Sequence, residues 1–230
     1  MIVHVSNGEA MEEIRRAQAR GLKVMGETCP QYLVLTEANL EGLNMDGAKY
    51  VCSPPPRDHP SQEACWRGLE TGIFQVYSSD HCPFRYEDEA GKLTPKGRTS
   101  FRWVPNGIPG VETRLPILFS EGVGKGRITL NQFVALTSTN HARIYGLYPR
   151  KGTIAIGADA DLALWDPAMQ VTIAADKLHQ GSDYTPYERM NVTGWPVMTI
   201  VRGTVVVQQG ELKGPMGHGA HLPRGLPRAG

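Results

Sequence analysis

The chain has 230 residues, a net charge of +1, and a composition of 40% hydrophobic and 20% charged residues. These values predict a globular protein with one large or two small domains, and the balanced charge argues against an electrostatic nucleic-acid surface. No apolar run reaches the length that spans a membrane, and the opening Met1-Ile2-Val3-His4 lacks the features of a signal peptide. We therefore expect a cytoplasmic protein that binds neither nucleic acid nor membrane.

The first 25 residues follow a strand, helix, strand pattern. Residues 2–5 are apolar except for His4, and Ser6-Asn7-Gly8-Glu9 is typical of a capping box for a helix that ends near Arg20. Residues 22–25 resemble a second strand. This unit builds parallel sheets and places His4 near the carboxyl end of its strand. A lone histidine there is more often a hydrogen-bonded structural residue than a metal ligand.

The same pattern continues up to residue 77. Residues 48–52 form a candidate strand that ends at Ser53, and the three prolines at 54–56 then fix a stiff, extended loop. A helix is predicted from Pro60 to Glu70, and it leads into another apolar run at 73–77.

The run at 73–77 ends in two polar, ionisable side chains. Its β-branched and aromatic residues predict a buried parallel strand, which Pro83 cannot extend. Asp80 and His81 therefore fall at the carboxyl end of the strand, where barrels and open α/β sheets gather ligands and catalytic groups. The alternative is that Asp80 only caps a turn.

Beyond Pro83 the chain changes character. Residues 85–102 are charged and predict a long surface loop of the kind that often covers a site, while residues 106–110 are dense in turn formers. Helices are predicted from about Val111 to Ser120, and from a capping box at Thr129 through Tyr145.

From Lys151 onward the hydrophobic period is two, which predicts antiparallel sheet. Short strands are expected at 152–156, 161–165, 171–173, 197–201 and 204–207. Arg202-Gly203 joins the last two and suits a tight hairpin. The glycine- and proline-rich tail from 214 has too little apolar content to fold alone.

The four cysteines, at 29, 52, 65 and 82, show no CxxC pairing. Neither a zinc ribbon nor a disulfide framework is predicted, because both need paired cysteine spacing. We expect buried thiols or thiols near a site.

Six segments, in order along nearly the whole chain, resemble those of dihydropyrimidinases and D-hydantoinases, which are cyclic amidohydrolases of the binuclear-metal superfamily. They are His4-Val5-Ser6, Gly26-Glu27-Thr28-Cys29-Pro30-Gln31-Tyr32-Leu33, Lys49-Tyr50-Val51-Cys52-Ser53-Pro54-Pro55, Ser79-Asp80-His81-Cys82-Pro83-Phe84, Pro105-Asn106-Gly107-Ile108-Pro109-Gly110 and Gly157-Ala158-Asp159-Ala160-Asp161-Leu162. The resemblance covers only the carboxyl-terminal half of such an enzyme.

The resemblance implies an α/β fold with the carboxyl-terminal part of a (β/α)8 TIM-type barrel at 1–150. A small antiparallel β-sandwich module at 151–213 and an extended tail at 214–230, a candidate oligomer contact, would follow. Homotetramers are usual in the family.

The resemblance also implies roles for four residues. His4 resembles a ligand of one metal, and Asp80 resembles both a ligand of the other metal and the base that handles the proton of the bridging hydroxide. Ser53 and Asn106 match positions that bind the cyclic amide substrate, largely through main-chain atoms. Two divalent ions, expected to be zinc, would lower the pKa of bound water. Hydrolysis would open a dihydropyrimidine or hydantoin ring to an N-carbamoyl amino acid.

In the family, the other metal ligands lie before the half that this chain matches; they are a His-x-His pair, a carboxylated lysine and another histidine. A tyrosine that stabilises the oxyanion lies there too. A catalytic zinc normally has about three protein ligands, whereas this chain supplies only His4 and Asp80. We therefore expect the chain alone to be inactive, to hold no stable binuclear centre, and to need a complementary amino-terminal half. Four further histidines do not match family ligands and are expected to be structural or exposed: His59, His81, His141 and His179.

Two alternatives stay open. Non-catalytic dihydropyrimidinase-like scaffolds of cytoskeletal signalling share the fold, but they have lost metal ligands, whereas His4 and Asp80 persist here. The second alternative is a different cyclic amidohydrolase, such as an allantoinase or dihydroorotase. Against it, the Ser-Pro-Pro and Asn-Gly-Ile-Pro-Gly segments favour dihydropyrimidinase or hydantoinase.

Overall fold

The computed structural model describes residues 1–227. The chain falls into two compact units, which are described separately. Unit 1 consists of Met1–Leu118 and Thr172–Asn191, and unit 2 of Phe119–Val171 and the chain from Val192 onward. The module boundaries predicted after residues 150 and 213 stay predictions.

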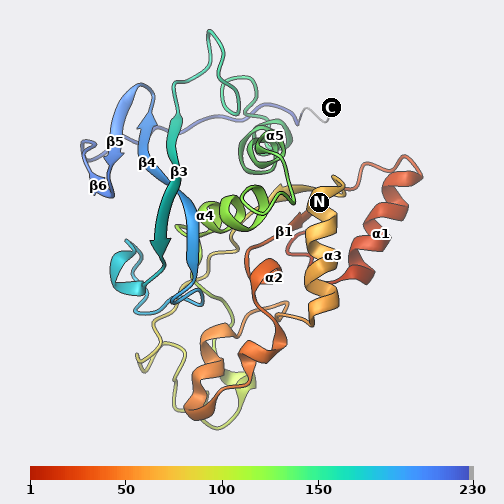
Figure 1. The fold of residues 1–230 in the computed structure, drawn as a ribbon, viewed down its shortest axis with the longest axis vertical. Helices are drawn as coiled ribbons and strands as arrows, with labels where there is room; N and C mark the ends of the chain where they lie inside the picture. Colours follow the sequence, from red (N-terminus) through yellow and green to blue (C-terminus); the bar gives the residue numbers. More distant parts are fainter. Residues whose placement is uncertain (228–230) are drawn as a thin grey trace. The chain divides into compact units, whose positions relative to one another are not determined.

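Unit 1 contains a short parallel sheet flanked by helices (Figure 1). Strands β1 (Gly26–Thr28) and β2 (Phe74–Tyr77) are parallel, with Thr28 opposite Tyr77. Isolated parallel bridges join Ile2 to Gly26 and His81 to Ile108. The helical elements are α1 (Gly8–Ala19), α2 (Gln31–Val34), η1 (Glu37–Leu40), η2 (Leu43–Tyr50), α3 (His59–Glu70), η3 (Phe101–Trp103), α4 (Arg114–Leu118) and η6 (Ala175–Lys177).

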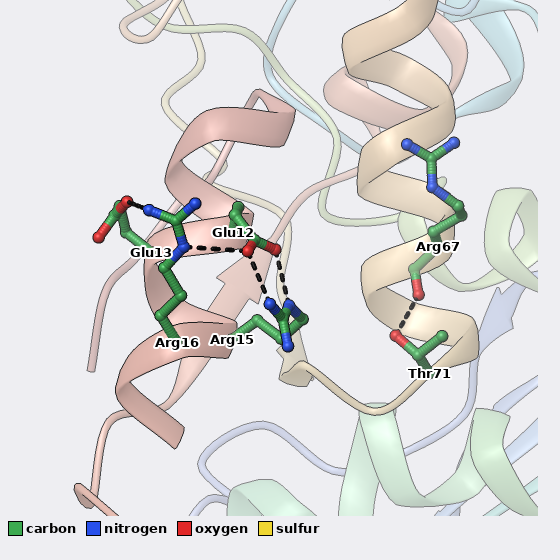
Figure 2. Close-up of polar contacts among 6 residues, drawn as sticks. All are labelled: Glu12, Glu13, Arg15, Arg16, Arg67 and Thr71. Carbon is green, nitrogen blue, oxygen red and sulfur yellow. Dashed lines mark hydrogen bonds and ion pairs between the residues drawn. The ribbon is translucent and has the colours of Figure 1, made fainter. Parts of the chain in front are cut away.

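Helix α1 begins at a side-chain cap and lies beside α3 (Figure 1). The Asn7 side chain accepts a hydrogen bond from the Ala10 amide, so Asn7 rather than Ser6 is the cap. The outer face carries ion pairs from Arg15 and Arg16 to Glu12, and the Arg15 hydrogen bond lowers the pKa of Glu12 to about 2 (Figure 2). Because these pairs are exposed to solvent, they contribute little to stability.

The core of unit 1 is built around β2. Phe74 is 1% exposed, and Val76 and Tyr77 are fully buried. A Cβ atom on Gly68 of α3 would lie 2.4 Å from the Phe74 ring, so α3 approaches the strand closely only because Gly68 has no side chain. The predicted strand at 73–77 and the predicted helix at 60–70 are confirmed.

Two strands predicted in unit 1 are wrong in position or type. Residues 22–25 form no strand, and β1 begins at Gly26 instead. Residues 48–50 belong to the 3-10 helix η2, and residues 51–52 are irregular. The apolar side chains there do not face a sheet, because Ala48 packs in a separate buried cluster with Leu93 and Val104.

Unit 2 combines a helical segment with an antiparallel β hairpin. Its elements are a π-helical turn at Phe119–Val123, α5 (Leu130–Val134), a π-helical segment at Ala135–Thr139, α6 (Asn140–Ile144), β3 (Leu162–Thr172), β4 (Asn191–Val201), β5 (Thr204–Gln208) and β6 (Glu211–Leu212). The sheet order is β3-β4-β5-β6, and β4 and β5 are antiparallel (Figure 1). The predicted hairpin at Arg202-Gly203 and the capping box at Thr129 are confirmed.

The predicted strands of unit 2 need two corrections. Residues 152–156 form no strand, and Ile154 is 87% exposed, because no neighbouring strand among residues 1–227 covers it. The runs at 161–165 and 171–173 are largely one strand, β3, which passes through Pro167. Since β3 is the first strand in the sheet order, it has an edge on which proline is tolerated.

The tail from 214 has no helix or strand up to residue 227. The Gly225 amide donates a hydrogen bond to the Gly146 carbonyl at 2.8 Å, so the tail packs on the loop after α6. Residues 228–230 of the predicted tail lie outside the described residues. Among the described residues, no helix combines the length and apolar character needed to cross a membrane.

Candidate active site

His4 and Asp80 both follow parallel strand segments at one edge of the unit 1 sheet. The Val5 amide donates to the Glu27 carbonyl at 2.8 Å, and the Ser78 amide donates to the Thr28 carbonyl at 3.1 Å. These bonds carry the pairing to the carboxyl ends of all three segments. The sheet therefore places both predicted residues at the edge where parallel sheets collect functional groups.

The backbone turns sharply at both residues. His4 has a φ of 43° and Asp80 has a φ of 47°, in the left-handed region that most side chains avoid. His4 is partly buried and Asp80 is exposed. Histidine and aspartate tolerate this conformation better than most residues, and such strain is concentrated at functional sites.

The Asp80 carboxylate acts electrostatically on buried groups beneath this edge. Burial, together with the nearby Asp80 charge, raises the pKa values of the Cys29 thiol and the Tyr32 hydroxyl. The same two causes outweigh the opposing Lys92 charge and raise the pKa of Cys52 to about 12. Burial therefore keeps these two thiols and the tyrosine hydroxyl in their neutral forms at physiological pH.

Ser53 and Asn106 lie in direct contact although they are far apart in sequence. Ser53 Oγ donates to Asn106 Oδ1 at 3.0 Å, and the Gly107 amide donates to the Val51 carbonyl at 3.1 Å. The Cys82 amide donates to the Ile108 carbonyl at 3.2 Å, which joins the segment after Asp80 to the same loop.

Glycine is required at position 107. Its φ is 134°, and a Cβ atom there would lie 2.6 Å from Cys82. A side chain at this position would separate the loop of Asn106 from the segment that follows Asp80.

His81 has a structural role, as predicted. Its Nδ1 accepts hydrogen bonds from the amides of Gly110 and Val111 at 3.0 and 3.2 Å, and burial lowers its pKa. The imidazole is therefore neutral and holds the end of the Asn106 loop. The other three contact neighbouring groups: His59 with Gln62, His141 with the Leu136 carbonyl, and His179 with Glu112.

Lys92 was missed by the sequence analysis. It lies in the charged segment at 85–102, which was predicted to be a surface loop, yet its side chain is fully buried. Lys92 Nζ donates to the carbonyls of Val51 and Pro105 at 2.7 and 2.6 Å. No local pattern distinguishes it from the exposed Lys96 in the same segment, so one sequence offers no signal for it.

The donors of this chain do not by themselves fit a two-metal centre. Among residues 1–227, no group of three or more histidine, cysteine, aspartate or glutamate side chains could hold a metal ion. His4 and Asp80 are a single imidazole and a single carboxylate, whereas a catalytic zinc normally has about three protein ligands.

The cysteines differ in exposure, which predicts their reactivity. Three of the four are buried and only Cys82 is exposed. Because burial raises the pKa of the Cys52 thiol to about 12 while Cys82 is exposed to solvent, we expect Cys52 to react far more slowly than Cys82. Titration of the native protein with a disulfide reagent should show one fast thiol, and unfolding should release all four. The fast phase should disappear in Cys82→Ser; two or more fast thiols in the native protein would contradict this arrangement.

Comparison with known proteins places the chain. Residues 2–206 match the model of the amidohydrolase family. The chain therefore belongs to the amidohydrolase family, the class that the resemblance of its six sequence segments had indicated.

The relatives narrow this class. The chain is 49% identical to the D-hydantoinase of Geobacillus stearothermophilus over 97% of its own length and 46% of the relative's. The crystal structure of dihydropyrimidinase from Brevibacillus agri NCHU1002 matches with a TM-score of 0.94 and 46% identity, over 99% of this chain and 48% of that one. The structure of an L-hydantoinase (dihydropyrimidinase) from Arthrobacter aurescens matches with a TM-score of 0.82 and 36% identity, over 91% of this chain and 45% of that one. Within the amidohydrolases, the chain is thus a member of the hydantoinase and dihydropyrimidinase family, and it spans about half the length of these relatives.

Proposed function

We propose that this chain forms the carboxyl-terminal half of a cyclic amidohydrolase that opens hydantoin or dihydropyrimidine rings to N-carbamoyl amino acids. The observation that carries the proposal is the placement of His4 and Asp80 at one sheet edge, with the segment after Asp80 bonded to the loop of Asn106. The similarity to hydantoinases and a dihydropyrimidinase supports this class of substrate.

In the proposed site, the four residues share three tasks, which are metal binding, proton transfer and substrate binding. His4 and Asp80 each contribute a ligand to a centre of two divalent ions, expected to be zinc, whose remaining ligands lie outside this chain. Asp80 also accepts a proton from the attacking water and returns it to the ring nitrogen that leaves. Ser53 and Asn106, held 3.0 Å apart, bind the cyclic amide.

The proposed whole protein is a (β/α)8 barrel with a β-sandwich, assembled as a homotetramer. Exposed apolar side chains lie where further structure would pack: Met1, Ile2 and Val3 at the free edge beside β1, and Ile154 in the region before β3. Exposed apolar groups on an unpaired edge mark a surface that other polypeptide covers. A complementary amino-terminal half, on the same or a separate chain, is the proposed partner.

A joined enzyme tests the proposal. The part of the Geobacillus stearothermophilus D-hydantoinase that this chain does not match is fused ahead of residues 1–230, and the purified fusion is assayed with dihydrouracil, substituted hydantoins, allantoin and dihydroorotate. We expect hydrolysis of hydantoins or dihydrouracil and about two metal ions per polypeptide, against fewer than two for the present chain alone. A folded fusion, by circular dichroism and gel filtration, that hydrolyses none of the four contradicts the proposal. Selective hydrolysis of allantoin or dihydroorotate assigns a different substrate.

A further inference from the structure

We infer that Lys92 is a positioning residue whose buried ammonium group fixes the Ser53 and Asn106 loops as one substrate-binding unit. The inference rests on the proposed function for the identity of the ligand, a cyclic amide, but the clamp itself is a property of this chain. Lys92 would act through the two loops and does not touch the reacting atoms.

The first argument is where the lysine donates. Nζ bonds the carbonyls of Val51 and Pro105, which lie two residues before Ser53 and one residue before Asn106. The Val51 carbonyl also accepts the Gly107 amide, so this one oxygen is shared by the lysine and the Asn106 loop. A single cation thus connects two loops that are more than 50 positions apart in sequence.

The second argument is that the lysine is itself held firmly. The Lys92 amide donates to the Arg85 carbonyl at 2.8 Å, and the Leu93 amide donates to the Tyr86 carbonyl at 3.2 Å. The next residue, Leu93, is anchored in the apolar cluster with Ala48 and Val104, and these come from the segments that precede the two loops. The clamp therefore connects segments that the same apolar cluster already holds together.

The third argument is energetic. Burying a lysine without a charged partner is costly, and an apolar residue of the same size often gives an equally stable fold. Burial lowers the pKa of Lys92 to about 8, so the group is still mainly protonated at neutral pH and its bonds to both carbonyls are charge-assisted. A cation kept at this junction serves geometry rather than stability.

Hydrogen exchange on the present chain tests the clamp independently of any enzyme activity. In Lys92→Met, which keeps most of the length of the side chain but removes its donors, we expect the Gly107 amide to exchange at least about tenfold faster than in the original chain. Lys96→Met is the matched control, because Lys96 is exposed in the same segment. Unchanged exchange at residue 107 in a folded Lys92→Met variant overturns the inference.

Kinetics of the joined enzyme test the consequence. Because the proposed function assigns equal binding of substrate and transition state to these loops, we expect Lys92→Met to raise KM about tenfold or more and to change kcat by less than about threefold. Lys92→Arg retains the charge and the donors and should recover most of the affinity, whereas Lys92→Gln, which is too short to reach both carbonyls, should not. If Lys92→Met does not fold, the KM values of Lys92→Arg and Lys92→Gln are compared instead, and a higher KM for Lys92→Gln supports the inference. An equal KM in all folded variants overturns the role in substrate binding.

The two proposals fail in different ways. In one case the joined enzyme is inactive, but its Gly107 amide is protected from exchange and Lys92→Met removes this protection. That result contradicts the proposed function and leaves the clamp intact. In the other case the joined enzyme is active, but substitutions at position 92 change neither its KM nor the hydrogen exchange of the Gly107 amide. That result contradicts the clamp alone.

Discussion

In the joined enzyme, Asp80→Asn should reduce kcat by at least roughly 10⁴-fold, the upper range for loss of a general acid–base group. Two proposed tasks disappear together, because the amide neither carries the proton nor supplies the anionic oxygen that a metal prefers. Asparagine is the informative replacement: like aspartate, it tolerates the φ of 47° found at this position. The backbone turn should therefore survive while the charge is lost. Steady-state hydrolysis of a hydantoin, together with metal analysis, measures the effect.

The control for this variant is Asp176→Asn, which removes an exposed aspartate of η6 and should leave turnover within a factor of about two. Equal circular dichroism spectra for both variants exclude unfolding as the cause. Substantial activity in Asp80→Asn would remove Asp80 from the mechanism. The hydrogen bond between the segment after Asp80 and the loop of Asn106 would then have no role in catalysis.

Local sequence signals predicted the parts of the fold that local forces determine. The caps at Asn7 and Thr129 need only side chains within three residues, and both helix starts were found, the first displaced by one residue. The run at 73–77 is buried because its residues suit a parallel strand, and β2 lies there. The assignment of Asp80 to the sheet edge followed from this strand.

The errors arose where distant contacts decide the structure. Residues 48–52 are as apolar as a strand, but Ala48 packs against Leu93 and Val104, which no local pattern reveals. The contact between Ser53 and Asn106 joins residues separated by 53 positions, and only the family resemblance suggested that both bind substrate. Lys92 lies in a segment rich in charged residues, and the sequence alone does not distinguish a buried lysine from an exposed one.

Phe74→Ala should strongly destabilise unit 1. Phe74 is 1% exposed, and its ring fills the space that Gly68 leaves on α3, so truncation opens a cavity between helix and strand. Loss of a buried phenylalanine costs about 3–5 kcal/mol. At a slope of about 2–3 kcal/mol per molar urea, the unfolding midpoint should fall by roughly 1–2.5 M. The matched control is Phe101→Ala, which removes the same atoms from a side chain that is 79% exposed and should cost about 0.5 kcal/mol or less.

The Phe74 variant also tests how the site depends on the core. β2 leads directly to Asp80, and its last residues pair with β1, whose neighbour on the other side carries His4. A looser β2 should therefore loosen the sheet edge before the protein unfolds, and hydrogen exchange at the Ser78 amide, which is bonded to the Thr28 carbonyl, should report this. If Phe74→Ala and Phe101→Ala unfold at the same urea concentration, the ring does not hold α3 on the sheet. The packing of this unit would then have to rest on other contacts.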